Sequence, residues 1–284
     1  HRYTLMTEHV CPVGALTSRD FRFKARVWFL KTRESVCDGC ATGCASFADF
    51  DPRKGLIQRL RPRDDEKVNG FWMCDDGMLS YKRNHEARIE VATVGREAVR
   101  HFASTEEALE HAARMLRDVP AGQRAVVLSA AHSTEDNLAL AAFAKAWGAK
   151  LFLAHRPDWE GDEILRNADQ NPNRKGAQLA AGEASLGSLD DLVAAIEAGE
   201  VKGAVVLGAA TTRAADELSA FDAATVVSLN THISPFALKA DVVIPVTTHF
   251  EHEGSFVNAA GLVRRFDRVV PPVPGVLSGV EAVA

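Results

Sequence analysis

Three cysteines fall within eight consecutive positions of this chain, in the stretch VCDGCATGC. They are Cys37, Cys40 and Cys44, spaced C-x2-C-x3-C, and Cys74 follows later in WMCDDG. Thiols this close on one short segment are typical of metal ligands rather than of packing residues. The fold must therefore wrap one short loop around a common centre and bring a distant residue to it.

Two kinds of centre suit four thiolates, a [4Fe–4S] cluster and a structural zinc ion. Zinc sites with four cysteines usually pair two C-x2-C groups, whereas here a triplet is completed by one distant cysteine. This asymmetry favours the iron–sulfur cluster, with zinc as the alternative. Gly39 and Gly43 allow the backbone to pass close to the centre and leave amide groups free to face the sulfur atoms.

The composition limits the classes of function. The 284 residues include 46% hydrophobic and 25% charged residues, as in an ordinary globular protein. A formal net charge of −5 gives no electrostatic case for a nucleic-acid partner. The sequence contains no long uncharged apolar run, so we expect no direct membrane insertion. Five cysteines without an export signal argue against a disulfide framework and favour a cytoplasmic location.

The chain divides by composition into a basic and aromatic start, a cysteine-bearing part, and a part in which short apolar runs alternate with helical patterns. This order predicts an α/β protein: a small iron–sulfur domain rich in short strands and turns, followed by a doubly wound parallel-sheet domain. We expect long loops over residues 156–187. The expected helices are 106–116, 134–147, 189–197 and 213–221, and the expected strands are 125–129, 150–153, 204–207, 225–229 and 241–246.

Several stretches resemble a known family. VCDGCATGC followed by GFWMCDDG resembles the iron–sulfur domain that opens molybdopterin-type oxidoreductases. The stretch CPVGALTSRDFRFKARVWFLK (11–31) resembles the large iron–sulfur subunit of respiratory complex I, which is the G subunit of NADH-quinone oxidoreductase. NPNRKGA (171–177), ADVVIP (240–245) and FEHEGSFVN (250–258) resemble short motifs of that family's α/β domain. The resemblance spans nearly the whole chain.

The resemblance implies a role for each cysteine. One [4Fe–4S] cluster, away from the main electron path, would be ligated by Cys37, Cys40, Cys44 and Cys74. Cys11, in a C-P context, would be the last ligand of a second, ferredoxin-like [4Fe–4S] cluster whose other ligands lie upstream and are absent here. With the start at His1, this implies an N-terminally truncated fragment.

The same resemblance implies three domains. Residues 1–33 would be the C-terminal end of a ferredoxin-like iron–sulfur domain, and residues 34–90 the [4Fe–4S] domain. Residues 91–284 would be a molybdopterin-oxidoreductase-like α/β domain. In molybdenum enzymes of this superfamily a C-x-K-G pattern follows the last cysteine ligand, but Asp76 stands in place of the lysine here. Asp76 and the short α/β region argue against molybdopterin as a cofactor.

The function implied is that of an iron–sulfur electron-transfer or structural subunit of an NADH:quinone oxidoreductase, with no catalytic pocket of its own. Its partners would be the flavin- and NADH-binding subunit and other peripheral-arm subunits, on the cytoplasmic face of the inner membrane. Two alternatives stay open. In the first, the chain is a fragment of a molybdenum or tungsten formate dehydrogenase. In the second, it is a non-redox scaffold held together by a cluster or by zinc.

Three further features have structural interpretations. HFEHE (249–253) resembles a metal motif, but no third ligand is obvious, so we expect a structural segment. Gly208 is expected to be a loop glycine with positive φ. In the basic run Arg19–Arg33, aromatic residues such as Phe21 and Phe23 alternate with cations as in a strand. We expect a packed structural face there, with docking to acidic partner subunits as the alternative.

Overall fold

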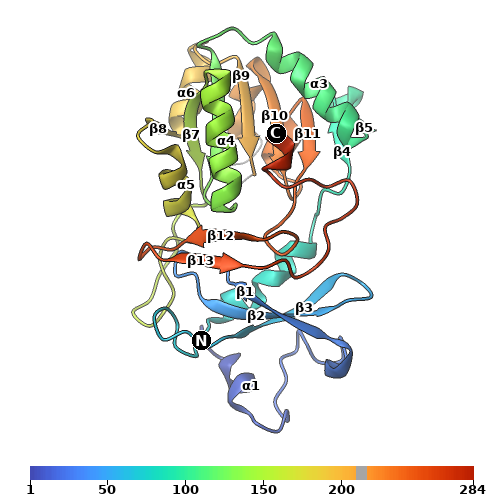
Figure 1. Ribbon diagram of the computed structural model, residues 1–284, viewed down its shortest axis with the longest axis vertical. Helices are drawn as coiled ribbons and strands as arrows, with labels where there is room; N and C mark the ends of the chain where they lie inside the picture. Colours follow the sequence, from blue (N-terminus) through green and yellow to red (C-terminus); the bar gives the residue numbers. More distant parts are fainter. Residues whose placement is uncertain (209–215) are drawn as a thin grey trace. The chain divides into compact units, whose positions relative to one another are not determined.

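The computed structural model describes residues 1–208 and 216–284, and this part of the chain forms two compact units (Figure 1). Each unit combines three separate stretches of sequence. The units therefore do not follow the continuous ranges 1–33, 34–90 and 91–284, because two later segments return to the cysteine-bearing unit. Unit 1 comprises residues 1–86, 158–172 and 249–271, and unit 2 comprises residues 87–157, 173–248 and 272–284.

Unit 2 is built on one eight-stranded sheet. Its strands are β4 (Ala92–Val94), β5 (His101–Ala103), β6 (Arg124–Ser129), β7 (Lys150–Ala154), β8 (Leu186–Ser188), β9 (Gly203–Leu207), β10 (Thr225–Asn230) and β11 (Val242–Pro245). Their order is β5-β4-β11-β10-β9-β6-β7-β8. The strands from β11 to β8 pair in parallel, whereas β4 and β5 are antiparallel.

Helices cover both faces of this sheet. One face packs against α3 (Thr105–Arg117), α4 (Thr134–Trp147) and α5 (Arg174–Ala181), and the other against α6 (Leu189–Glu197), η4 (Asp216–Ala223) and α7 (Pro235–Lys239). Along β6, Val126 and Leu128 point to the first face, and Ala125 and Val127 to the second. Burial of both faces explains why the strands are uniformly apolar, and it confirms the doubly wound α/β fold.

Helix ends in unit 2 follow local sequence signals. Ser133 caps α4, because its Oγ accepts a hydrogen bond from the Asp136 N–H at 3.0 Å. Gly148 ends the helix with a left-handed φ of 71°. At α6, Ser188 and Asp191 form a reciprocal capping box. The structure confirms the helices predicted over 134–147 and 189–197, and these local signals explain why they could be predicted.

Two expectations for unit 2 need correction. Residues 156–187 are not loops throughout, because they contain α5 and the start of β8. Gly176 is part of α5, where an added Cβ would lie 2.0 Å from Asn173 Oδ1, so close packing requires this glycine. The helix expected over 213–221 begins outside the described residues, and the described part, η4, is a 3-10 helix.

Unit 1 is rich in short strands and turns, as predicted. A three-stranded antiparallel sheet has the order β1-β2-β3, and β12 and β13 form a hairpin. The strands are β1 (Lys31–Val36), β2 (Ala45–Asp51), β3 (Leu56–Pro62), β12 (Gly254–Val257) and β13 (Val263–Phe266). The helices are α1 (Met6–Val10), η1 (Val27–Phe29), α2 (Asp75–Leu79) and η2 (Ser80–His85), while η3 (Glu97–Val99) and η5 (Glu281–Val283) belong to unit 2.

The basic run Arg19–Arg33 is not the strand with a packed face that we expected. Phe21 is buried beneath the Arg59 guanidinium, whose carbon lies 4.1 Å from the ring centre. Phe23 has a φ of 63° and a side chain that is 90% exposed. A left-handed turn at Phe23 breaks the alternation, so the two aromatic rings do not share a face.

Asp49 holds the three-stranded sheet together from its middle strand. Its buried carboxylate accepts hydrogen bonds from Thr32 Oγ1, Arg59 Nε and Arg61 Nε, each at 2.7 Å. Burial by itself raises the pKa of Asp49, but the hydrogen bonds from Arg61, Thr32 and Arg59 outweigh it, so the pKa lies below its usual value. Both neighbouring strands therefore depend on this one charge.

We predict that Asp49→Asn lowers the free energy of unfolding by about 2 kcal/mol, because hydrogen bonds to a buried charge are lost. Denaturant titration at neutral pH measures the change. The contribution of Asp49 is complete above about pH 4 and is lost as the pH falls through its lower folded-state pKa. The difference between the two proteins should therefore shrink in acid.

Glu34→Gln is the matched control. Glu34 pairs with Arg63 at 2.8 Å in the same sheet, but its side chain is 62% exposed. Its replacement should change the free energy of unfolding by less than about 1 kcal/mol. Equal losses in the two variants would contradict the role given to Asp49.

Candidate functional site

The four predicted ligands lie together in unit 1. Cys37 directly follows β1, Cys44 directly precedes β2, and Cys40 lies on the loop between them. The Cys37 N–H donates to the Cys44 carbonyl at 2.9 Å and closes this loop. Cys74 is the N-cap residue of α2. All four side chains are buried.

Two glycines bring backbone close to the sulfur atoms. The Gly39 N–H donates to Cys37 Sγ at 3.3 Å, and the Gly77 N–H donates to Cys74 Sγ at 3.4 Å. A methyl group on Gly77 would lie 3.0 Å from Cys37 Sγ and 3.4 Å from Cys74 Sγ. The first and last cysteines of the motif thus meet at Gly77. The N–H of Gly39 faces a sulfur as predicted, whereas the N–H of Gly43 donates to the Cys40 carbonyl at 3.3 Å, and the role of Gly77 was not predicted.

Burial raises the pKa of three of these thiols. For Cys37 and Cys44 the other cysteines add to the effect, since neighbouring thiolates repel one another. Burial raises the pKa of Cys74 to about 11, although the Gly77 N–H lowers it. A cationic group that binds here must displace protons, and its charge then offsets the repulsion.

Soft thiol donors, exclusion of water and N–H groups aimed at sulfur fit an iron–sulfur cluster. Within residues 1–208 and 216–284, no group of three or more His, Cys, Asp or Glu side chains is arranged to hold a metal ion. The four thiols share one buried region without converging on a single point. Cys37, Cys40, Cys44 and Cys74 are the residues that would hold the cluster.

Distant segments of unit 1 fix the loop that carries the three cysteines. The Ala41 N–H donates to the Asp169 carbonyl at 2.8 Å, and Thr42 Oγ1 donates to the Leu165 carbonyl at 2.7 Å. From the β12–β13 hairpin, Asn258 Nδ2 donates to the Thr42 carbonyl at 3.0 Å. The loop therefore gains its shape from residues far away in the sequence.

Cys11 lies apart from this group and is partly exposed. Backbone N–H groups of Leu16, Val13, Ala15 and Gly14 approach its sulfur and lower the pKa of Cys11. A lower pKa favours the thiolate, which is the form that ligates metals.

The two other sequence features, HFEHE (249–253) and Gly208, are packed against neighbouring side chains. His249 packs against Phe250, Phe256 and Phe266 with ring centres 3.7, 5.7 and 5.6 Å apart. Burial lowers the pKa of His249 to about 4. Gly208 has the expected positive φ, +64°, and an added Cβ would lie 2.3 Å from His132 Cε1.

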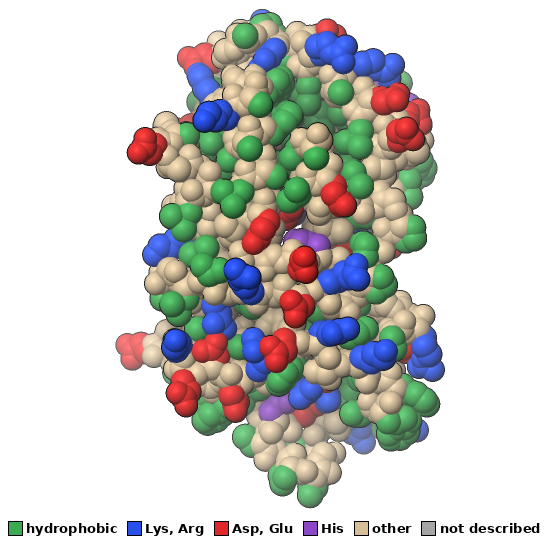
Figure 2. All heavy atoms as spheres, viewed as in Figure 1, with side chains coloured by type: hydrophobic (Ala, Val, Ile, Leu, Met, Phe, Trp, Pro, Cys, Tyr) green, Lys and Arg blue, Asp and Glu red, His purple; other side chains and the backbone are tan. Residues whose placement is uncertain are grey.

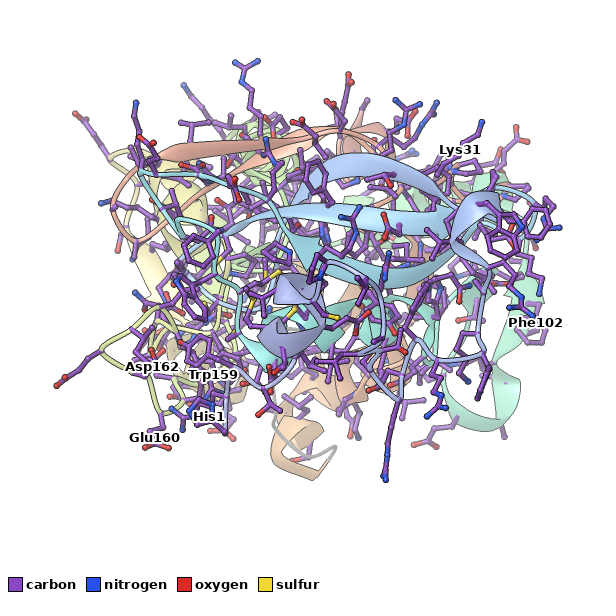
Figure 3. The ribbon with its side chains drawn as sticks, turned by 90° about the horizontal axis from the view of Figure 1, so that it is seen from below. His1, Lys31, Phe102, Trp159, Glu160 and Asp162 are labelled. Carbon is purple, nitrogen blue, oxygen red and sulfur yellow. The ribbon has the colours of Figure 1, made fainter. Side chains whose placement is uncertain are left out.

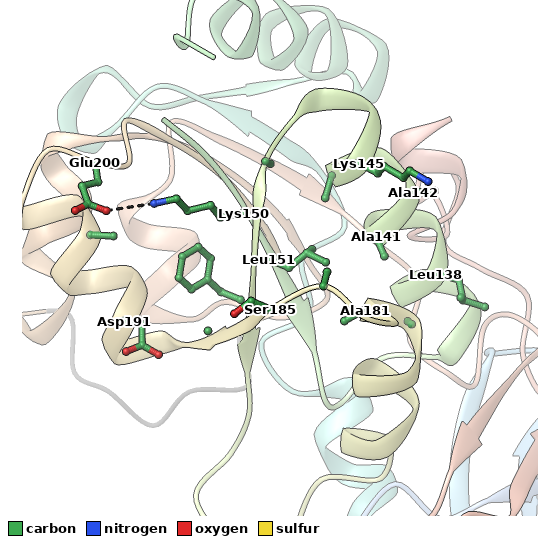
Figure 4. A pocket seen from close by; sticks show the side chains of 17 residues that line it. Leu138, Ala141, Ala142, Lys145, Lys150, Leu151, Ala181, Ser185, Asp191 and Glu200 are labelled. Atoms are coloured by element: carbon green, nitrogen blue, oxygen red, sulfur yellow. Dashed lines mark hydrogen bonds and ion pairs between the residues drawn. The ribbon is translucent and has the colours of Figure 1, made fainter. Parts of the chain in front are cut away.

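Unit 2 contains an open hollow of about 930 Å³ beside β7 and β8 (Figure 4). Most of its lining side chains are alanines and other apolar residues of α4, α5, α6 and β7. Among its charged residues, Lys150 pairs with Glu200 at 3.2 Å, and Asp191 belongs to the capping box of α6. These charged groups thus have structural partners, and we assign the hollow no chemistry.

Two cations near the cysteines were missed at the sequence level. Arg166 lies 3.5 Å from Asp76, two residues beyond Cys74, and Arg264 donates to the Gly43 carbonyl, directly before Cys44. No local motif marks either residue, since both come from segments far from the cysteines.

In the described part of the chain, no helix has the length and apolar character needed to span a membrane.

Comparison with known proteins gives a consistent result. The family model described as molybdopterin oxidoreductase matches residues 153–275. The G subunit of NADH-quinone oxidoreductase from Streptomyces coelicolor is 33% identical over 141 residues, which are 49% of this chain and 16% of that protein. NADH-quinone oxidoreductase subunit 3 of Thermus thermophilus is 31% identical over 137 residues, 48% of this chain and 17% of that protein. The alignments thus span less than a fifth of these relatives.

A solved structure is similar in fold. Acetylene hydratase from Pelobacter acetylenicus superimposes with a TM-score of 0.55 over 88% of this chain and 68% of its own, at 10% sequence identity. At this identity the likeness concerns the fold alone. The comparisons confirm the resemblance to the G subunit of NADH-quinone oxidoreductase and to the molybdopterin oxidoreductase fold.

We predict that Gly77→Ala weakens metal binding by about tenfold, because the added methyl presses on Cys37 Sγ and Cys74 Sγ. Helix α2 itself should not suffer, since alanine favours a helix by about 1 kcal/mol over glycine. Iron and zinc per chain, measured after anaerobic purification, test this.

Gly55→Ala is the control for this substitution. Gly55 has a φ of +64°, and nothing lies within 4 Å of an added Cβ. It should lose some stability through backbone strain but keep its metal. Full metal content in Gly77→Ala would rule out the proposed crowding.

Proposed function

We propose that this chain is part of an iron–sulfur subunit of an NADH:quinone oxidoreductase, and that Cys37, Cys40, Cys44 and Cys74 hold a [4Fe–4S] cluster. The observation that carries the proposal is the burial of four thiols with backbone N–H groups aimed at two of them. The names of the relatives support the choice of complex. A [4Fe–4S] cluster supplies one-electron transfer when bound.

The residues of the chain act on this site in three ways. Burial excludes water, Gly39 and Gly77 donate hydrogen bonds to sulfur, and the loop is held by Thr42 and Asn258. Cys11 supplies one ligand to a second [4Fe–4S] cluster, completed by cysteines of a preceding segment. Residues 1–33 would then close a ferredoxin-like domain, and residues 34–90 would form the [4Fe–4S] domain, which residues 158–172 and 249–271 join in unit 1. The rest of residues 91–284 would be an α/β domain without molybdopterin.

The names of the relatives favour this function over a fragment of a formate dehydrogenase, and Asp76 in place of a lysine supports the same choice. The partners would be a flavin- and NADH-binding subunit and other peripheral-arm subunits. In a bacterial cell such an arm would lie on the cytoplasmic face of the inner membrane.

Anaerobic purification of the full chain should yield about four irons per chain, with visible absorption that dithionite bleaches. Cys40→Ser should lose most of this iron, since one ligand of the cluster is removed. Cys11→Ser is the matched control, because Cys11 lies outside the group of four, and its iron content should stay unchanged. Stoichiometric zinc without iron would overturn the cluster assignment.

An exposed segment of aromatic and basic residues supports the proposal that this chain binds a partner subunit. We call Phe23, Val27, Trp28 and Phe29 the aromatic strap; their side chains are at least half exposed. Arg22 lies over the ring of Phe23 and Arg26 over that of Trp28, at 4.9 and 5.8 Å. Hydrophobic side chains gather beside Lys and Arg at the lower right of the face in Figure 2. Exposed aromatics among cations fit an acidic partner surface.

We predict that Trp28→Ser leaves the melting temperature unchanged and weakens assembly with the flavin-containing partner by at least about tenfold, because interface tryptophans often contribute about 2 kcal/mol or more. Co-purification of the complex from cells that express all subunits measures this. Phe102→Ser is the control, since Phe102 is a 79% exposed aromatic outside the strap (Figure 3). Normal assembly of Trp28→Ser would exclude the strap as an interface.

A further inference from the structure

Arg166 is a buried cation beside the segment that carries Cys74. Its side chain is 9% exposed, and its guanidinium carbon lies 3.6 Å from the centre of the Trp159 ring. Its Nε lies 3.5 Å from Asp76 Oδ2. Asp76 is two residues beyond Cys74, so a distant cation and a local carboxylate meet next to one thiol.

A tight turn positions Arg166. The Asp162 carboxylate accepts hydrogen bonds from the N–H groups of Ile164, Leu165 and Arg166 at 3.0, 2.8 and 3.0 Å. Tyr3 donates to the same carboxylate at 2.8 Å. Trp159 and Asp162 are on the same loop (Figure 3). The guanidinium is thus held by backbone geometry as well as by its two side-chain neighbours, and it has little freedom to swing into solvent.

Arg264 approaches the site from a second segment. Its Nε donates to the Gly43 carbonyl at 3.0 Å, directly before Cys44. Its Nη1 lies 2.7 Å from Asp65 Oδ2, and its side chain is 12% exposed. A second buried cation therefore lies beside the residue that directly precedes Cys44.

We propose that Arg166 and Arg264 set the reduction potential of the cluster, and that Asp76 partly cancels the effect of Arg166. Reduction adds one electron to the cluster without forming or breaking a bond. The negative charge of the site therefore increases. A fixed positive charge in a water-poor interior stabilises that added charge, and a carboxylate opposes it. This inference rests on the [4Fe–4S] cluster proposed above.

The test is an equilibrium redox titration of the anaerobically purified full chain, followed by visible absorption and electron paramagnetic resonance. Arg166→Gln should make reduction about tenfold less favourable, which lowers the potential by about 59 mV for one electron. Asp76→Asn should shift the potential upward, because it removes the opposing charge and keeps the arginine. Arg264→Gln should shift it downward.

Arg166 and Asp76 form one ion pair, so opposite shifts of the potential in their two variants would indicate an effect of charge rather than of altered structure. Loosening of the site would shift the potential of Arg166→Gln and Asp76→Asn in the same direction, and that result would overturn the inference. Arg53→Gln is the matched control, since Arg53 pairs with Asp51 at 2.9 Å but is 63% exposed, and its potential should not move.

Iron content is measured first, so that the two proposals fail differently. Absence of iron from the unmodified chain overturns the proposed function. Full iron with unchanged potentials in Arg166→Gln, Asp76→Asn and Arg264→Gln overturns only the role of these charges. If Arg166→Gln does not retain iron, an upward shift in Asp76→Asn supports the inference and an unchanged potential overturns it.

Discussion

The arrangement of unit 1 depends on keeping four thiols in one dry region. Burial disfavours the thiolates of Cys37 and Cys44, and repulsion from the neighbouring cysteines adds to that cost. A short loop with two glycines has few internal contacts of its own to meet this cost. The carbonyl and amide groups of Ala41, Thr42 and Gly43 are instead bound by residues of the 158–172 and 249–271 segments. The discontinuous composition of unit 1 follows from this requirement.

Features that depend on neighbouring residues were predictable from the sequence. The helix from Thr134 to Trp147 carries its cap at Ser133 and its stop at Gly148, and the strands of unit 2 are short apolar runs between such helices. The C-x2-C-x3-C spacing is local too, so the three-cysteine loop could be recognised. Cys74 could be added to it because, apart from Cys11, it is the one remaining cysteine of the chain.

Features that depend on distant residues were not predictable in this way. Helix α5 was missed because Asn171, Pro172 and Asn173 indicate a turn, while its packing against α4 is a tertiary effect. Phe23 is exposed because its own backbone is left-handed, and the alternation of aromatic and basic residues gives no sign of that conformation. Arg166 and Arg264 are two of many arginines, and only the folded chain shows that they lie near Cys74 and Cys44.

The charges around the site follow from the same requirement. Thiolates that hold the proposed cluster would be stabilised by positive charge nearby, and an unpaired buried arginine would itself be unstable. Arg166 and Arg264 are therefore each paired with a carboxylate, Asp76 and Asp65. Such pairs supply a field at the sulfurs without leaving a net buried charge. Asp76 thus has a physical role of its own, because it holds and moderates a cation that comes from another segment of the chain.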